Sequence, residues 1–325
     1  MTSKKQIVIG SGLLLLFLLV PLVTRSFDLP FYLLLATRIV IFAIAALSLD
    51  LILGYGGMAS FGHSVFLGLG GYTVGIMAFH GIDNAWLQWP VALIVCATAS
   101  AIIGLISLRS SGVYFLMITL ALAQMLYLVA FSLKAYGGDD GLPLDRRSML
   151  WPLNLADPTQ FYLLCLGLLA VFYFLLVRLV RSRFGLLLRG SQENLIRLET
   201  LGFPTLRYRL VAFMISGTMC GVAGILLTNL TEFIAPSYMS WERSGELMIM
   251  VAIGGIGTLF GPIIGAAAFL CAQEIISTFT PHWQLFVGPA LVVIVLGAQR
   301  GALSFRSRKR TKLKYARTTG SAAVS

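Results

Sequence analysis

The residues best suited to handle a polar solute inside a membrane lie in one glycine-rich stretch, GYGGMASFGHSVFLGLGGY, from Gly54 to Tyr72. Seven of its nineteen residues are glycine, and apolar runs flank it on both sides. Non-helical backbone is tolerated at membrane depth where it is buried in protein or lines a water-filled cavity. We therefore predict that a helix breaks near the start of this stretch and offers polar atoms to a translocation path. The candidate path residues are Gly56, Gly57, Ser60, His63 and Ser64.

Covalent catalysis has no comparable support in the sequence. The patterns GxxxxGK[ST], HExxH and GxSxG, which mark phosphate-binding loops, zinc proteases and serine hydrolases, are absent. The three histidines are far apart, and each of the four cysteines stands alone in an apolar run. We expect no catalytic residue, no metal site and no cofactor held by this chain. His63 by itself is more readily a structural hydrogen-bonding group than a solute ligand.

Four ionisable residues fall inside apolar segments: Arg38, Asp50, Glu246 and Glu274. Such residues pair with one another, reach toward the membrane interface, or serve a gate or path. No regular ladder of acids runs through the apolar segments, which counts against a proton-driven carrier.

The elements that must position these residues are membrane helices. The chain has 325 residues, of which 58% are hydrophobic and 11% charged, with a mean hydropathy of +0.89; a soluble domain carries about 25% charged residues. We predict an all-α polytopic fold with a single transmembrane domain over 1–305 and a basic, disordered tail over 306–325. The ten expected segments are 7–23, 31–53, 58–80, 86–107, 113–133, 160–178, 208–230, 244–257, 262–278 and 284–299.

The distribution of basic residues predicts how the chain is oriented in the membrane. With both termini in the cytoplasm, eighteen of the 24 Lys and Arg residues lie on the inner side, as the positive-inside rule requires. We read the N-terminus as a retained first helix rather than a signal peptide. The basic tail then contacts anionic membrane lipid, and we expect no nucleic acid partner.

Segments 58–80, 113–133 and 244–257 are unusual, being glycine-rich or short, and we expect broken or re-entrant helices there. The letters GGMASFGHSVFLG, beginning at Gly56, have a faint echo in GGIGTLFGPIIG, beginning at Gly254. This echo hints at two five-helix halves in inverted orientation, an arrangement typical of transport proteins. The GxxxG pair Gly217 and Gly221 is read as helix packing.

The longest inner loop, about 181–207, contains RSRFGLLLRGSQENLIRLETLGFP. Its spacing predicts an amphipathic helix that Gly202 and Pro204 end. Such a helix lies on the membrane surface or docks into a partner, and its mixed charges favour a protein partner.

Four stretches together resemble the LivM-like permease subunit of ABC importers for branched-chain amino acids. They cover most of residues 47–268 and read LSLDLILGYGGMASFGHSVFLGLGGYTVGI, GVYFLMITLALAQMLYLVAF, RFGLLLRGSQENLIRLETLGFPTLRYRLVAFMISGTMCGVAGILL and PSYMSWERSGELMIMVAIGGIGTLFGPIIGAA. The resemblance implies a multi-pass protein of the bacterial inner membrane. Its implied partners are a second permease subunit, two cytoplasmic ATPase subunits that use ATP and Mg²⁺, and a periplasmic solute-binding protein.

In that family the helix over 188–202 would couple the permease to an ATPase. The residues that fit the pattern are Arg189, Glu193, Asn194, Glu199 and Gly202. An amino acid would cross as a zwitterion, for which the sparse polarity of Ser60, Ser64 and Thr119 is suited. Three alternatives stay open: a permease for urea or short amides, a permease for another small amino-acid-like solute, and a passive channel.

Overall fold

The computed structural model describes residues 10, 12, 15–19, 21, 30–144, 146–151 and 154–279. Met1–Leu270 form one compact unit, which is the one described here, and Cys271–Ser325 form a second. The predicted tail over 306–325 lies outside the described residues. The helices of eight residues or more are α2 (Pro30–Asp50), α3 (Ser64–Phe79), α4 (Ala85–Ser107), α5 (Val113–Ser132), α6 (Pro158–Arg181), α7 (Arg183–Glu193), α9 (Thr205–Thr231), α10 (Trp241–Gly254) and α11 (Gly261–Phe279).

Shorter elements connect these helices. They are the π turn η1 (Leu51–Tyr55), the 3-10 turns η2 (Lys134–Tyr136), η3 (Gly138–Asp140) and η4 (Pro236–Met239), the helix α8 (Leu195–Thr200), and the strands β1 (Leu142–Pro143) and β2 (Phe233–Ile234). The two strands pair antiparallel, with Leu142 opposite Ile234.

Six helices in the described residues are long and apolar enough to cross a membrane. They are Phe31–Tyr55, Ala85–Ser107, Val113–Ser132, Pro158–Arg181, Thr205–Thr231 and Gly261–Thr278. The predicted segments 58–80 and 244–257 instead hold α3 and α10, of 16 and 14 residues. Segment 284–299 and most of 7–23 lie outside the described residues. The count of ten spans is therefore not confirmed, and the side on which the termini lie stays a prediction.

The expectation of a broken or re-entrant helix over 113–133 is wrong. These residues form α5, an uninterrupted helix of 20 residues. The reason is visible in its sequence, because no glycine or proline falls between Val113 and Ser132. The nearby Gly112 precedes the helix with a φ of 63°, so it sets the turn into α5.

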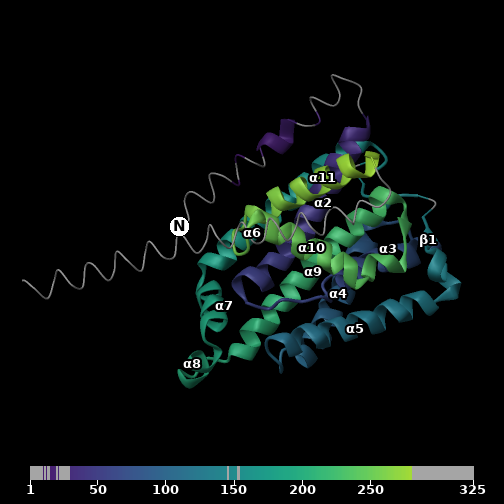
Figure 1. The fold of residues 1–325 in the computed structure, drawn as a ribbon. Helices are drawn as coiled ribbons and strands as arrows, with labels where there is room; N and C mark the ends of the chain where they lie inside the picture. Colours follow the sequence, from purple (N-terminus) through teal and green to yellow (C-terminus); the bar gives the residue numbers. More distant parts are fainter. Residues whose placement is uncertain are drawn as a thin grey trace, which may run out of the picture. The chain divides into compact units, whose positions relative to one another are not determined.

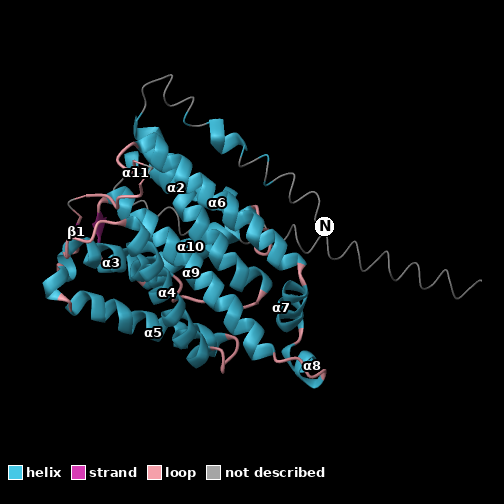
Figure 2. Cartoon of the chain, turned by 180° about the vertical axis from the view of Figure 1, so that it is seen from behind, coloured by secondary structure: helices cyan, strands magenta, loops and turns pink. Residues whose placement is uncertain are grey.

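Helix α9 occupies the centre of the unit and packs against α2, α3 and α4, as Figure 1 shows. The apolar windows of α2 and α9 are 78% and 72% buried, whereas that of α5 is 22% buried. The first two helices thus form the interior, and α5 presents most of its surface outward. In both views α7 and α8 lie at one end of the unit and β1 lies at the other (Figures 1 and 2).

Glycines allow the central helices to approach closely. A Cβ on Gly70 of α3 would overlap the carbonyl oxygen of Gly221 in α9, and one on Gly224 of α9 would overlap that of Leu67 in α3. On the α4 side of α9, a Cβ on Gly217 would lie 2.7 Å from the Ser100 Cβ. The packing role predicted for the GxxxG pair is confirmed.

Candidate functional site

The predicted helix break after α2 is present. The helix widens into the π turn η1, and the amide of Met58 donates to the Ile52 carbonyl over 2.8 Å. Gly57 then takes a φ of +65°, which favours glycine, and regular helix resumes at Ser64. We name residues 56–63 the first break. Its glycines give the backbone the freedom that the sequence indicated.

A second break, residues 255–260 between α10 and α11, lies against the end of α2 and the π turn η1, just before the first break. The Gly257 amide donates to Asp50 Oδ1 over 2.7 Å, and a Cβ on Gly54 would lie 2.5 Å from the Gly257 nitrogen. The glycine motif that begins at Gly254 therefore lies against the turn that directly precedes the motif at Gly56. The inverted-repeat interpretation stays a prediction.

The structure also shows the contacts of the ionisable residues in the apolar segments. Arg243 Nη1 lies 2.6 Å from Glu246 Oε2, and both Arg243 and Arg38 lie over the ring of Phe42 at 5.9 Å. Asp50 is fully buried, and its Oδ2 has no partner among the described residues. The pairing expected for such residues is thus found for Glu246 and, through a backbone amide, for Asp50.

Two predicted path residues, His63 and Ser64, connect separate elements, and Ser60 makes a local contact within the first break. Ser64 Oγ donates to the Ser240 carbonyl over 2.8 Å and lies 2.7 Å from Ser244 Oγ, which fastens the start of α3 to the start of α10. His63 Nε2 lies 2.8 Å from Ser48 Oγ of α2, and Ser60 Oγ accepts from the amide two residues on. The side chains of all three predicted residues are fully buried. Within one chain these groups hold the first break in shape.

The other three predicted path residues differ in their surroundings. Thr119 is buried, and its hydroxyl donates to the Leu116 carbonyl of its own helix over 3.0 Å. Gly56 is buried beneath Leu188 of α7. Gly57 is exposed and lines a cavity of about 270 Å³. The path role of the six residues stays a prediction, and Gly57 is the one that the structure brings to an open space.

The segment predicted as one helix over 188–202 is two helices, α7 and α8, so that prediction is wrong in detail. Asn194 adopts extended backbone between them, with φ −158° and ψ 98°, and its Oδ1 accepts from the Arg197 amide over 3.0 Å. Asparagine competes with the helix by this kind of local bond and caps the next one. The predicted stop is confirmed, because Gly202 has a φ of +81° after α8.

Helix α7 is seated on the first break. Leu188 is fully buried, and a Cβ on Gly57 would lie 2.8 Å from the Gln192 Cγ. Arg189 places its guanidinium 5.1 Å from the Tyr55 ring centroid and donates to the Val180 carbonyl at the end of α6. Any displacement of α7 therefore acts on the turn that ends α2.

The outward surface of α7 and α8 carries apolar side chains. Ile196 is 73% exposed and Leu201 is 65% exposed. Glu193 and Asn194 are exposed beside them, whereas Glu199 accepts a hydrogen bond from Thr205 Oγ1 at the start of α9. We name residues 193–202 the α8 knob, an apolar tip with a polar rim.

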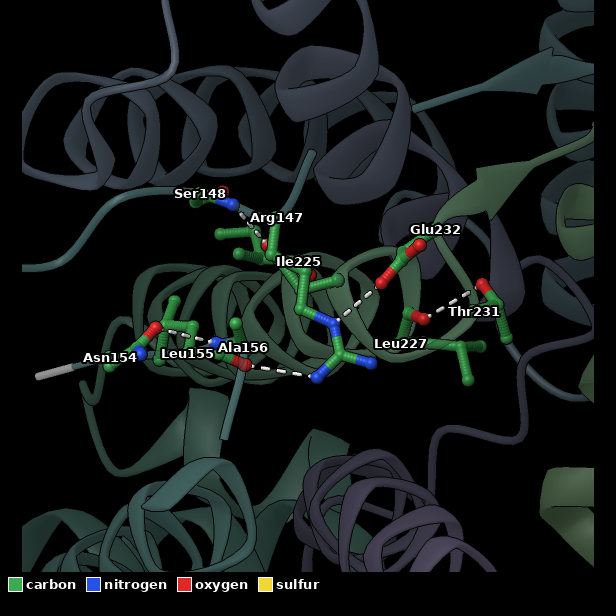
Figure 3. A network of polar contacts seen from close by, with 10 residues as sticks. Arg147, Ser148, Asn154, Leu155, Ala156, Ile225, Leu227, Thr231 and Glu232 are labelled. Atoms are coloured by element: carbon green, nitrogen blue, oxygen red, sulfur yellow. Dashed lines mark hydrogen bonds and ion pairs between the residues drawn. The ribbon is translucent and has the colours of Figure 1, made fainter. Parts of the chain in front are cut away.

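At the opposite end, the loops around 134–159 and 231–243 form one surface. Figure 3 shows Arg147 between them: its Nε is 2.8 Å from Glu232 Oε1, and its Nη1 donates to the Leu155 carbonyl over 2.9 Å. The Ser148 amide also donates to Asn229 Oδ1 over 2.8 Å. A cavity of about 610 Å³ opens beside this network, with Trp151 exposed on its wall.

A family model described as the permease component of branched-chain amino acid transport systems matches residues 31–296. The chain belongs to this permease family. Such permeases are transport subunits of membranes and not enzymes, and the six apolar helices fit a multi-pass membrane protein.

Curated relatives of the permease include two proteins called high-affinity branched-chain amino acid transport system permease protein LivM, from Salmonella typhimurium and Escherichia coli. Each is 25% identical over 312 residues, which covers 89% of this chain and 73% of the relative. An autoinducer 2 import system permease protein LsrC from Yersinia pestis is 27% identical over 272 residues, or 78% of this chain and 66% of the relative. No solved structure gives a significant match.

We expect Arg147→Ala to loosen the loops 134–159 and 231–243 of the permease while leaving the helices folded. The change removes an ion pair, a hydrogen bond and the stacking of Arg147 on Phe161 at 5.6 Å. These charge-assisted contacts are partly exposed and together stabilise the loops by about 1–3 kcal/mol. Limited proteolysis of membrane vesicles should cleave residues 146–156 at least severalfold faster. An unchanged cleavage rate would show that other contacts hold the loop.

Sequence reasoning missed two features of this site. It did not identify the hydrogen-bond partner of Asp50, because the contact with Gly257 joins residues that are 207 positions apart. It also counted Arg209 only as an inner charge, whereas the structure buries Arg209 beside Gly57. The sequence did contain a signal for Arg209, because a basic residue within the first turns of an apolar helix is unusual.

Proposed function

We propose that the permease is a membrane-spanning subunit of an ABC importer of the bacterial inner membrane that carries leucine, isoleucine and valine. A periplasmic binding protein delivers the solute, a second permease subunit completes the path, and two cytoplasmic ATPase subunits supply the energy. The names of the LivM relatives support the substrate. The observation that carries the coupling role is the α8 knob, whose exposed Ile196 and Leu201 fit an apolar groove on a partner.

The proposed cycle uses both ends of the unit. The loaded binding protein docks on the outer loops 134–159 and 231–243. ATP binding closes the ATPase subunits, which displaces α7 and α8. Because α7 rests on the first break, this displacement shifts the population between outward-open and inward-open states.

Uptake of labelled leucine, compared with labelled urea, tests the proposal in cells with and without this chain. We expect the deletion to lower leucine uptake at least tenfold and to leave urea uptake unchanged. Loss of urea uptake alone would keep the architecture and change the substrate to urea or short amides. Uptake of neither solute depending on the chain would contradict the substrate proposal, and the LsrC relatives indicate that a wider solute screen should follow.

A passive channel is the alternative from another class. A channel needs no ATPase, so depleting the ATPase subunits should leave its flux intact. We expect uptake through the permease to stop under that depletion.

A further inference from the structure

The cavity beside the first break is lined by a buried arginine that has no hydrogen-bond or ion-pair partner among the described residues. Arg209, in the first turns of α9, is 8% exposed. Its Nε has no hydrogen-bond partner, and no carboxylate of the described residues lies within ion-pair distance of its guanidinium. Glu199 acts on it through space, but that carboxylate accepts its hydrogen bond from Thr205. A buried guanidinium normally has its donors occupied, so this one has donors to offer to a ligand.

The walls of this cavity are mainly apolar. Met58 comes from the first break, and Val113, Phe115 and Leu116 come from the start of α5. The exposed backbone of Gly57 completes the wall on the side of α7. With a volume of about 270 Å³, the space is large enough for a small solute. Apolar walls with one fixed cation form an environment for an aliphatic molecule that ends in a carboxylate.

We propose that this cavity is a carboxylate-binding site for the transported amino acid on the α7 side of the permease, with Arg209 holding the carboxylate and the apolar wall holding the side chain. This inference rests on the proposed function, and it deepens that function by naming the group that is recognised. A neutral solute such as urea would leave the guanidinium unpaired. The site therefore favours amino acids over amides within the family.

The position of the site gives it a way to respond to α7. Gly57 lies between the cavity and Gln192, because its backbone lines the cavity while Gln192 packs against it. A displacement of α7 therefore moves the wall of the cavity together with the start of the first break. Release of the amino acid would then follow the motion of α7.

Arg209→Met separates a binding role from a structural one. Methionine keeps the length and apolar stem of the side chain but removes an unpaired buried charge, so the folded protein should not be destabilised. We expect membrane abundance and melting temperature to stay equal or rise, while maximal leucine uptake falls at least tenfold. Arg209→Lys should retain an intermediate rate. Arg178→Met, which changes an exposed arginine at the end of α6, is the control and should take up leucine normally.

A diazirine analogue of leucine and its carboxamide provide the direct test in the assembled transporter. We expect the analogue to label residues 57–59 or 113–116 in the wild type and not in Arg209→Met, and the carboxamide to label them in neither. Normal leucine uptake by Arg209→Met, or equal labelling by both probes, would overturn the inference and leave the proposed function standing. Absence of leucine uptake by the wild type would overturn both.

Discussion

Replacing Gly224 with valine is expected to remove most of the folded permease from the membrane. A Cβ at this position would overlap the carbonyl oxygen of Leu67, and the neighbouring Gly70 meets Gly221 in the same way. Helices α3 and α9 would have to separate, and α9 is the helix against which α2 and α4 also pack. Overpacking of this kind costs about 1–3 kcal/mol when side chains can adjust. Here the obstacle is backbone, which cannot rotate away.

Membrane abundance and thermal unfolding of the detergent-solubilised protein measure this effect. A loss of stability of a few kcal/mol changes abundance several-fold, so we expect a drop of about tenfold or more for Gly224→Val. Gly167→Ala is the matched control, because a Cβ on this glycine of α6 meets no atom within 4 Å. That variant should keep normal abundance. Normal abundance of Gly224→Val would mean that the close approach of α3 and α9 is not required.

Ile196→Asp is expected to abolish leucine uptake while the permease stays folded and abundant. The side chain is 73% exposed, so the isolated subunit loses little packing. Within the first turn of α8 an aspartate is also favourable to the helix. In an apolar groove of an ATPase subunit, however, its charge would be buried without a partner, which costs several kcal/mol. We expect at least a tenfold loss of uptake, and a loss of ATPase subunits that co-purify with the permease.

The conservative change Ile196→Leu keeps an apolar tip and should keep most of the uptake. Glu193→Lys tests the polar rim of the same α8 knob and should lower uptake at normal abundance. The competing interpretation places α8 on the membrane surface, where it has no protein partner. If the ATPase subunits still co-purified with Ile196→Asp and uptake persisted, that interpretation would replace ours.

The sequence was most informative where local physics decides the structure. Glycine density after Gly54 predicted the first break, and Gly202 marked the end of α8. Apolar run length predicted spans that the structure bears out as α2, α4, α5, α6, α9 and α11. For α5 the span was predicted, but the expected break within it was wrong, because its run of hydrophobic residues contains no glycine or proline. Sequence reasoning also failed at Asn194, whose cap divides α7 from α8.

Long-range contacts account for what sequence could not supply at the site. The spacing of Ser60, His63 and Ser64 indicated polar atoms at depth, but it could not show that Ser64 meets Ser244 and that His63 meets Ser48. Those partners connect α2, α3 and α10 at the first break, and the path role of these residues stays a prediction. Arg209 became a candidate only when the fold placed it beside Gly57.

The adjacency of Tyr55 and Gly54 has a mechanical consequence. Tyr55 carries the stacked guanidinium of Arg189 from α7, and the next residue back meets Gly257 in the second break. A displacement of α7 would therefore reach both breaks through two adjacent residues, with no further segment between the two contacts. A connection this short passes a displacement on without amplifying it. In the proposed importer, a wide opening would then have to come from rotation of α3 and α11 at the ends of the two breaks rather than from a long movement of α7.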